Sequence, residues 1–187
     1  MNKAFSFFPG CSYHSTGISY AQSTSYVAAT LGIDLYEIKD WNCCGASAAP
    51  TINDDLMYAL STRNLALSED QHPYLPVLTP CTGCYAALKR AEVKTNGDDS
   101  YRTRINNIIE MNYRGTAKVT NLLDAFTDQE MIDAIVSHLK LYLGGLKVAC
   151  YYGCGQTRPE PVTGSTNAEN PTNMEDLLNA AGAECVN

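Results

Sequence analysis

The chain has 187 residues, 45% of them hydrophobic, which is enough for one α/β domain with a packed core and the start of another. Its formal net charge of -7, without a basic cluster, argues against nucleic acid or an anionic lipid surface as the partner. No apolar run approaches the roughly 18 residues of a membrane span or forms a signal-peptide core, so the sequence predicts a cytoplasmic protein without a membrane span.

Strand and helix signals alternate from the start of the chain. An aromatic strand over residues 5–8 stops at Pro9-Gly10, and Cys11 follows at the strand end, where a parallel sheet usually places ligands. Residues 18–31 predict a helix that Gly32 ends. The next strand, over residues 34–38, leads into the sequence WNCCG at residues 41–45. Two strand ends therefore carry cysteine.

A third strand end carries the pair Cys81 and Cys84. The strand is predicted over residues 75–78, and the sequence CTGC turns from it into a helix over residues 85–93. Residues three apart on a helical turn face the same way, so both sulfurs should point to one place. The free N–H groups and the positive dipole end of a helix N-terminus also favour an anionic, thiolate-ligated group there.

The remaining segments of the first part of the chain read as core-forming helices. Asn53 should cap a helix that runs to about Leu67, and residues 95–100 form a polar break. Further helices are predicted over residues 101–114, 119–127 and 128–142, without a ligand set. The apolar residues expected in the core are Leu56, Leu60, Leu65, Ile105, Ile108, Ile109, Tyr113, Ile132, Ile135, Val136 and Leu139.

The last 44 residues resemble the start of the chain. A strand over residues 146–152 ends in Gly153-Cys154, as the first strand ends in Gly10-Cys11. A polar loop over residues 158–173, a helix over residues 174–181 and Gly182 follow. Such self-similarity indicates a duplicated unit. We therefore predict a first domain over residues 1–143 with its helical extension, and an incomplete second unit over residues 144–187.

The five cysteines of the first unit exceed what one tetrahedral ion can use. Neighbouring residues cannot easily place both sulfurs on one ion, whereas a multi-iron cluster offers several metals, so the adjacent pair favours an iron–sulfur centre. The proposed ligands are Cys11, Cys43, Cys44, Cys81 and Cys84. A zinc site of four thiolates with one spare thiol is the alternative. Disulfides are disfavoured in a reducing compartment.

Other residues near these motifs have both a functional and a structural interpretation. His14 is a candidate to hydrogen-bond a sulfide or to donate a proton to a leaving thiolate, but it also suits an ordinary loop. Trp41 and Lys39 either screen and balance the cluster or serve as a packed aromatic and a solvent-facing charge. Cys150 and Cys185 lie at apolar strand positions, which favours a structural role.

The cysteine spacing C-x31-CC-x36-C-x2-C, with glycine after the pair, resembles the CCG domain of the family formed by the B subunits of heterodisulfide reductases. The sequence YYGC at residues 151–154 looks like the opening of that family's second CCG unit. The resemblance implies that the five cysteines hold a non-cubane [4Fe-4S] cluster, and that Cys154 is the lone remaining ligand of a second cluster that a longer form would complete.

The same resemblance implies an oxidoreductase subunit that passes electrons to a disulfide of the CoM-S-S-CoB type. The expected partners are the ferredoxin-like C subunit and the flavin-containing A subunit of a heterodisulfide-reductase-like complex. With the second unit incomplete, we expect activity only in a complex and in a longer chain. Two alternatives stay open: a CCG subunit of a respiratory enzyme that acts on succinate, glycolate or lactate, and a zinc-stabilised or cluster-stabilised interaction module.

Overall fold

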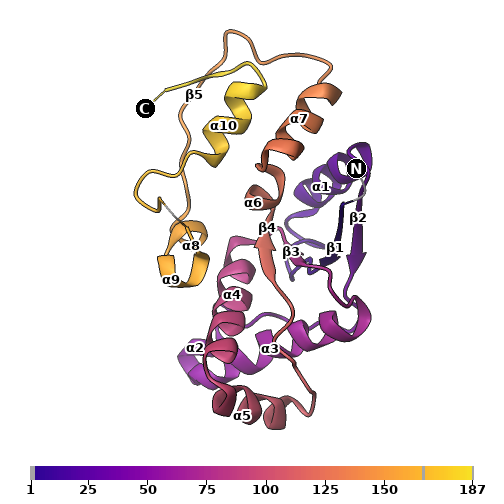
Figure 1. Ribbon diagram of the computed structural model, residues 1–187, viewed down its shortest axis with the longest axis vertical. Helices are drawn as coiled ribbons and strands as arrows, with labels where there is room; N and C mark the ends of the chain where they lie inside the picture. The colour runs from indigo at the N-terminus through magenta and orange to yellow at the C-terminus, as the bar shows by residue number, and fades with distance from the viewer. Residues whose placement is uncertain (1–2, 166, 187) are drawn as a thin grey trace. The chain divides into compact units, whose positions relative to one another are not determined.

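The structure is a computed structural model that describes residues 3–165 and 167–186. It divides into two compact units, Met1–Asn121 and Leu122–Asn187 (Figure 1). The predicted α/β class is confirmed, because parallel strands alternate with helices that pack around them. The domain boundary at residues 143 and 144 rests on sequence self-similarity and remains a prediction.

The first unit is built on a parallel sheet with the order β2-β1-β3-β4 in the part of the chain that the structure describes. Its strands are β1 (Lys3–Phe7), β2 (Ile33–Glu37), β3 (Val77–Thr79) and β4 (Val119–Asn121). The chain runs from β1 outward to β2 and then returns past β1 to β3. The order therefore reverses between β1 and β3, and parallel sheets bind ligands at the carboxyl ends of the strands at such a point.

Helices cover both faces of this sheet. They are α1 (Ile18–Thr30), α2 (Ala49–Ile52), α3 (Asp54–Gln71), α4 (Thr82–Gly97) and α5 (Asp99–Ile109). On one face, Ser6 of β1 accepts a hydrogen bond from Ser68 of α3 at 2.7 Å. On the other face, Phe7 packs edge-on against Tyr13. The Tyr13 hydroxyl in turn donates to the carbonyl of Ala21 in α1. Since adjacent strand residues point to opposite faces, α1 and α3 cover opposite sides. Figure 1 shows α3, α4 and α5 gathered together.

The core lies between the sheet and the helices α3 and α4. Its fully buried members are Phe8, Ile38, Leu65, Val77, Leu88 and Ala91. Of the predicted core residues, Leu65 and Ile105 are confirmed as buried, and Leu60 packs partly buried against the core. The prediction is wrong for Leu56 and Ile108, which are 36% and 53% exposed. Each helix buries one face, and these two side chains lie outside it.

The predicted helix over residues 119–127 is wrong in its first part. Residues 119–121 form β4, which pairs with β3 through Val119 and Val77. The amide N–H of Val119 also donates to the buried carboxylate of Glu92 at 2.9 Å. The predicted break over residues 95–100 narrows to Asp98, whose side chain caps α5 by accepting from the amide of Tyr101.

A buried carboxylate holds the segment that leads into β4. Glu69 of α3 is 3% exposed and accepts the amide N–H groups of Arg114, Thr116 and Ala117, as well as the hydroxyl of Thr116. A buried charge is stable where several donors satisfy it. Glu69 therefore joins α3 to the connection between α5 and β4.

The second unit contains two short parallel strands, β5 (Lys147–Val148) and β6 (Glu184–Cys185), among its described residues. Its helices are α6 (Leu122–Phe126), α7 (Gln129–His138), α8 (Cys154–Thr157), α9 (Glu160–Thr163) and α10 (Asn173–Ala180). The predicted strand over residues 146–152 is thus much shorter, and the predicted loop over residues 158–173 contains α9. In α7, Ile132 is buried, whereas the other predicted core positions are half-buried.

The two units repeat the same strand register. Val148 lies beside Cys185, as Phe5 lies beside Leu35 in the first unit. In both units a glycine with positive φ follows the preceding helix, Gly32 at +66° and Gly182 at +95°. None of the helices in the described part of the chain has the length and apolar character needed to cross a bilayer.

Candidate metal centre

Five cysteines lie at the carboxyl ends of three neighbouring strands. Cys11 follows β1, the pair Cys43 and Cys44 follows β2, and Cys81 and Cys84 lie after β3 at the start of α4. The ends of β1 and β3 flank the point where the strand order reverses. The site therefore lies where this fold places ligands, and its sulfurs come from segments far apart in the sequence.

The inner part of the site is a contact between two buried thiols. Cys44 Sγ and Cys84 Sγ are 3.3 Å apart and share a hydrogen bond. Two thiolates on one tetrahedral ion with bonds of about 2.3 Å lie about 3.8 Å apart. The separation of these two sulfurs is thus close to the one that a shared metal requires.

The thiols around Cys84 have strongly shifted pKa values. A hydrogen bond with Cys84 lowers the pKa of Cys44 to about 7, against the effect of burial. A hydrogen bond with Cys84 also lowers the pKa of Cys81 to about 5, with help from the amides of Cys84 and Gly83 at the start of α4. The pKa of Cys84 is raised, since Cys44 and Cys81 both hold its proton. Two sulfurs are therefore available as thiolates near neutral pH.

Cys43 and Cys11 form the outer part of the site, and both are exposed. The amide of Gly45 acts to lower the pKa of Cys43, but burial and the neighbouring sulfurs of Cys44 and Cys11 outweigh it, so that this pKa is raised. Each of the five thiols thus influences at least one other electrostatically. Among residues 3–165 and 167–186, however, no three ligating side chains stand in the arrangement of a ready-made single-ion site.

The residues present fit a thiolate-bound metal group. All five donors are soft sulfurs, which select zinc or iron–sulfur centres over hard cations. The backbone of Gly10 lies close to these sulfurs, and only a residue without a side chain fits there. A Cβ at this position would lie 2.9 Å from Cys84 Sγ.

Replacing Gly10 with alanine should destabilise the first unit by about 1–3 kcal/mol, because the Cβ would contact Cys84 Sγ and φ is +75°. Urea unfolding of the metal-free protein measures this loss. Gly97→Ala is the matched control, since a Cβ there meets nothing within 4 Å and φ is not positive. Equal unfolding midpoints for the two variants would show that the approach of Gly10 to Cys84 is not tight.

A polar stripe on α3 binds the backbone around the cysteine pair and the side chain of Ser6 in β1, and the sequence did not reveal it. Its members are spaced at helical intervals: Ser61, Asn64, Ser68 and Gln71. Gln71 accepts the amide of Lys39 at 2.7 Å and donates to its carbonyl at 3.0 Å. Polar residues at this spacing are equally typical of a solvent-facing side of a helix, so the spacing alone did not reveal these contacts.

His14 lies at the outer side of the site and is exposed. Its ring stacks on Trp41 at a centroid distance of 6.5 Å, and its Nε2 is 3.8 Å from Glu37 Oε1. Trp41 Nε1 donates to the same carboxylate oxygen at 3.2 Å and packs edge-on against Phe8. Trp41 is therefore a packed aromatic, whereas the role of His14 in proton transfer remains a prediction.

The cysteines of the second unit are placed differently. Cys154 is exposed at the start of α8, and Cys150 and Cys185 are half-buried. Cys185 Sγ donates to the carbonyl of Glu175 at 3.8 Å, and burial, followed by the charge of Glu175, raises the pKa of Cys150 to about 11. The proposed structural roles of Cys150 and Cys185 and the ligand role of Cys154 remain predictions.

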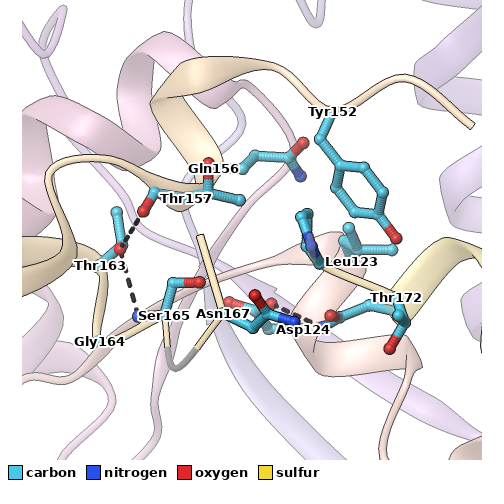
Figure 2. A pocket seen from close by; sticks show the side chains of 12 residues that line it. Leu123, Asp124, Tyr152, Gln156, Thr157, Thr163, Gly164, Ser165, Asn167 and Thr172 are labelled. Atoms are coloured by element: carbon cyan, nitrogen blue, oxygen red, sulfur yellow. Dashed lines mark hydrogen bonds between the residues drawn. The ribbon is translucent and has the colours of Figure 1, made fainter. Parts of the chain in front are cut away.

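The second unit also encloses a polar cavity of about 280 Å³. Figure 2 shows that hydroxyl and amide groups surround it, including Tyr152, Gln156, Ser165 and Thr172. No cysteine lines this cavity. It shares Tyr152, Thr157 and Pro171 with a neighbouring pocket that Cys150 and Cys154 line.

The fold and the thiols together define a cysteine-rich α/β domain. Residues 5–89 match the CCG family, described as a cysteine-rich domain, and this range contains all five cysteines of the site. The segment with the five cysteines is thus similar to the CCG family.

The chain is also similar to subunits of reductases. It is 39% identical over its whole length to the 8-methylmenaquinol:fumarate reductase membrane anchor subunit of Wolinella succinogenes, of which it covers 64%. It is 28% identical to the B subunit of the ferredoxin/F420H2-dependent CoB-CoM heterodisulfide reductase of Methanosarcina acetivorans, over 97% of the chain and 61% of the relative.

A third relative is the B subunit of the ferredoxin:CoB-CoM heterodisulfide reductase of Methanosarcina mazei, 28% identical over the whole chain and 62% of the relative. The chain thus spans less than two thirds of the length of these relatives. The resemblance to the B subunits of heterodisulfide reductases is confirmed.

Proposed function

We propose that this chain is an iron–sulfur electron-transfer subunit of a reductase complex. The observation that carries the proposal is the convergence of thiols from three strand ends at the reversal of the sheet, with Cys44 and Cys81 held at lowered pKa. Thiolates favour iron–sulfur centres, and such centres transfer electrons. The similarity to subunits of multi-subunit reductases supports the same conclusion.

Cys11, Cys43, Cys44, Cys81 and Cys84 are the proposed ligands. A non-cubane [4Fe-4S] cluster suits the adjacent pair, because one thiolate can contact more than one iron. When bound, such a cluster supplies reversible one-electron chemistry. The chain itself provides the thiolates, the amides at the start of α4 that face Cys81, and the buried surroundings of Cys44 and Cys84. Cys154 is the proposed ligand of a second cluster in a longer form.

The first candidate substrate is a disulfide of the CoM-S-S-CoB type. Two relatives that carry the name of a heterodisulfide reductase support it. In this proposal a ferredoxin-like C subunit and a flavin-containing A subunit deliver electrons, and the complex acts in the cytoplasm. His14 is the proposed proton donor to a thiolate product, since its ring lies at the exposed side of the site.

A second candidate is a respiratory subunit of the fumarate or succinate type. The higher identity to the relative named for 8-methylmenaquinol and fumarate favours it, 39% against 28%. The sequence-based alternative that includes glycolate and lactate enzymes belongs to the same class. In this role the cluster would exchange electrons with a quinone-linked partner rather than with a disulfide.

Anaerobic reconstitution tests the shared part of both candidates. We expect about four irons and a similar amount of acid-labile sulfide per chain, because five thiolates converge on one site. Elemental analysis and an EPR spectrum measure this. One zinc per chain without sulfide would instead support a zinc-stabilised interaction module.

The same preparation separates the two substrates. We expect the EPR signal of the chemically reduced cluster to disappear when CoM-S-S-CoB is added, if the disulfide is the oxidant. Loss of the signal with a menaquinone analogue but not with the disulfide would favour the respiratory role.

A further inference from the structure

The residues between β2 and the buried cysteine form a loop whose backbone is bound by side chains of α3. This cysteine-pair loop comprises residues 40–44. Asn64 lies behind it and is 0% exposed. Its Oδ1 accepts the amide N–H of Asn42 at 2.9 Å, and its Nδ2 donates to the carbonyl of Asn42 at 2.9 Å and to that of Leu60 at 3.1 Å.

Further hydrogen bonds fix the carbonyls on both sides of Asn42. The Ser61 hydroxyl donates to the carbonyl of Cys44 at 2.9 Å, and the Asn42 amide donates to that of Cys43 at 2.8 Å. Arg63 Nη1 donates to the carbonyl of Asp40 at 2.7 Å. The orientation of each of these peptide groups is therefore set by a side chain rather than by a strand or a helix.

The loop also needs an external restraint because its first residue, Asp40, has an unusual backbone angle. Asp40 has φ of +59°, and Gly45, directly after the loop, has φ of +78°. A non-glycine residue rarely adopts positive φ unless its surroundings hold it there. Between these two points the chain must place Cys44 inward, where it is 4% exposed, and Cys43 outward, where it is exposed.

We propose that Asn64 is a positioning residue that decides which sulfur of the adjacent pair faces Cys84 and which faces the open side. A rotation of the peptide groups around Asn42 would exchange the directions of Cys43 and Cys44, and the paired bonds from one buried amide prevent that rotation. The inference rests on the proposed function in one respect: the two sulfurs are taken to be ligands of one cluster.

The first measurement uses the metal-free full chain and does not depend on iron. The protein is alkylated with iodoacetamide at several pH values up to about 10, and each variant is compared with the wild type at the same pH, so that a change in access is read against equal conditions. Mass spectrometry then gives the ratio of label on Cys43 to label on Cys44. We expect about tenfold more label on Cys43 in the wild type and comparable labelling of both in Asn64→Leu.

Two control variants lie on the same helix. Thr62 is fully buried and its hydroxyl has no hydrogen-bond partner, so Thr62→Val removes no bond. Leu65→Ala loosens the apolar cluster, to which Cys44 also belongs, but it removes no hydrogen bond to the loop. Both should keep the wild-type ratio. If Leu65→Ala changed the ratio as much as Asn64→Leu, the effect would be general loosening and the proposal would be overturned.

The second measurement uses the reconstituted protein. Asn64→Leu should give a changed EPR line shape or at least a twofold loss of iron, whereas Thr62→Val should match the wild type. An unchanged EPR spectrum and iron content overturn the positioning role even if the labelling ratio shifts. If Asn64→Leu does not fold, Asn64→Asp is used in its place. This variant keeps the acceptor for the Asn42 amide but loses both N–H donors. A wild-type labelling ratio in Asn64→Asp would overturn the proposal.

The two measurements can contradict the proposed function and the role of Asn64 separately. A wild-type protein that binds no iron contradicts the proposed function, and the labelling ratio of the metal-free protein then decides the role of Asn64 alone. A wild-type labelling ratio in Asn64→Leu contradicts the role of Asn64, whatever the iron content.

Discussion

Replacing Cys44 with serine should reduce iron binding from about four atoms per chain to less than one, because an oxygen is a poor substitute for a thiolate that faces several metals. Cys44 is the buried member of the adjacent pair and contacts Cys84 directly. Iron analysis after anaerobic reconstitution measures the effect. Cys43→Ser should abolish the cluster or convert it to one with fewer irons.

The matched controls are the half-buried cysteines of the second unit. Cys150→Ser and Cys185→Ser should leave the iron content and the EPR spectrum unchanged, since neither thiol belongs to the five-cysteine site. If Cys150→Ser removed iron as completely as Cys44→Ser, the proposed set of ligands would be wrong.

Replacing Glu69 with glutamine should lower the free energy of unfolding by about 2–4 kcal/mol, because an uncharged amide cannot accept all of the donors that now face the buried carboxylate. Its NH2 group would face the amide of Arg114, or those of Thr116 and Ala117, depending on which carboxylate oxygen it replaces. Urea denaturation followed by circular dichroism measures the loss.

The exposed Glu130 provides the control for this change. Glu130→Gln lies on the solvent side of α7 and should alter the free energy of unfolding by no more than about 0.5 kcal/mol. A Glu69→Gln protein as stable as Glu130→Gln would show that the connection before β4 is held by other contacts.

The sequence predicted the cysteine-bearing strand ends because the strands before Cys11 and Cys81 are apolar and stop at proline, and the strand before Cys43 alternates polar and apolar residues. It failed at β4, where three residues next to a helix give too short a signal, and where pairing with Val77 decides the structure. It also placed Leu56 in the core, since leucine at a helical spacing does not reveal which face is buried.

The polar contacts behind the site could not be predicted in the same way. Asn64 and Ser61 are polar residues within a helix, and such residues are usually taken as solvent-facing. Their burial follows from the return of the chain through residues 40–44, which offers unpaired backbone groups to α3. That requirement is a property of the tertiary structure, so the helix sequence alone does not show it.

The repeated strand register shows where the second unit differs in length from the first. Cys11 and Gly32 are 21 positions apart, whereas Cys154 and Gly182 are 28 apart, so the second copy carries seven additional residues between two equivalent points. Because β5 and β6 keep the register of β1 and β2, the extra length is absorbed in the connecting segment. That segment contains α9 and much of the lining of the polar cavity in Figure 2. The longer connection therefore supplies most of the hydroxyl and amide groups that line the cavity of the second unit, while the pairing of β5 with β6 keeps the register of β1 with β2.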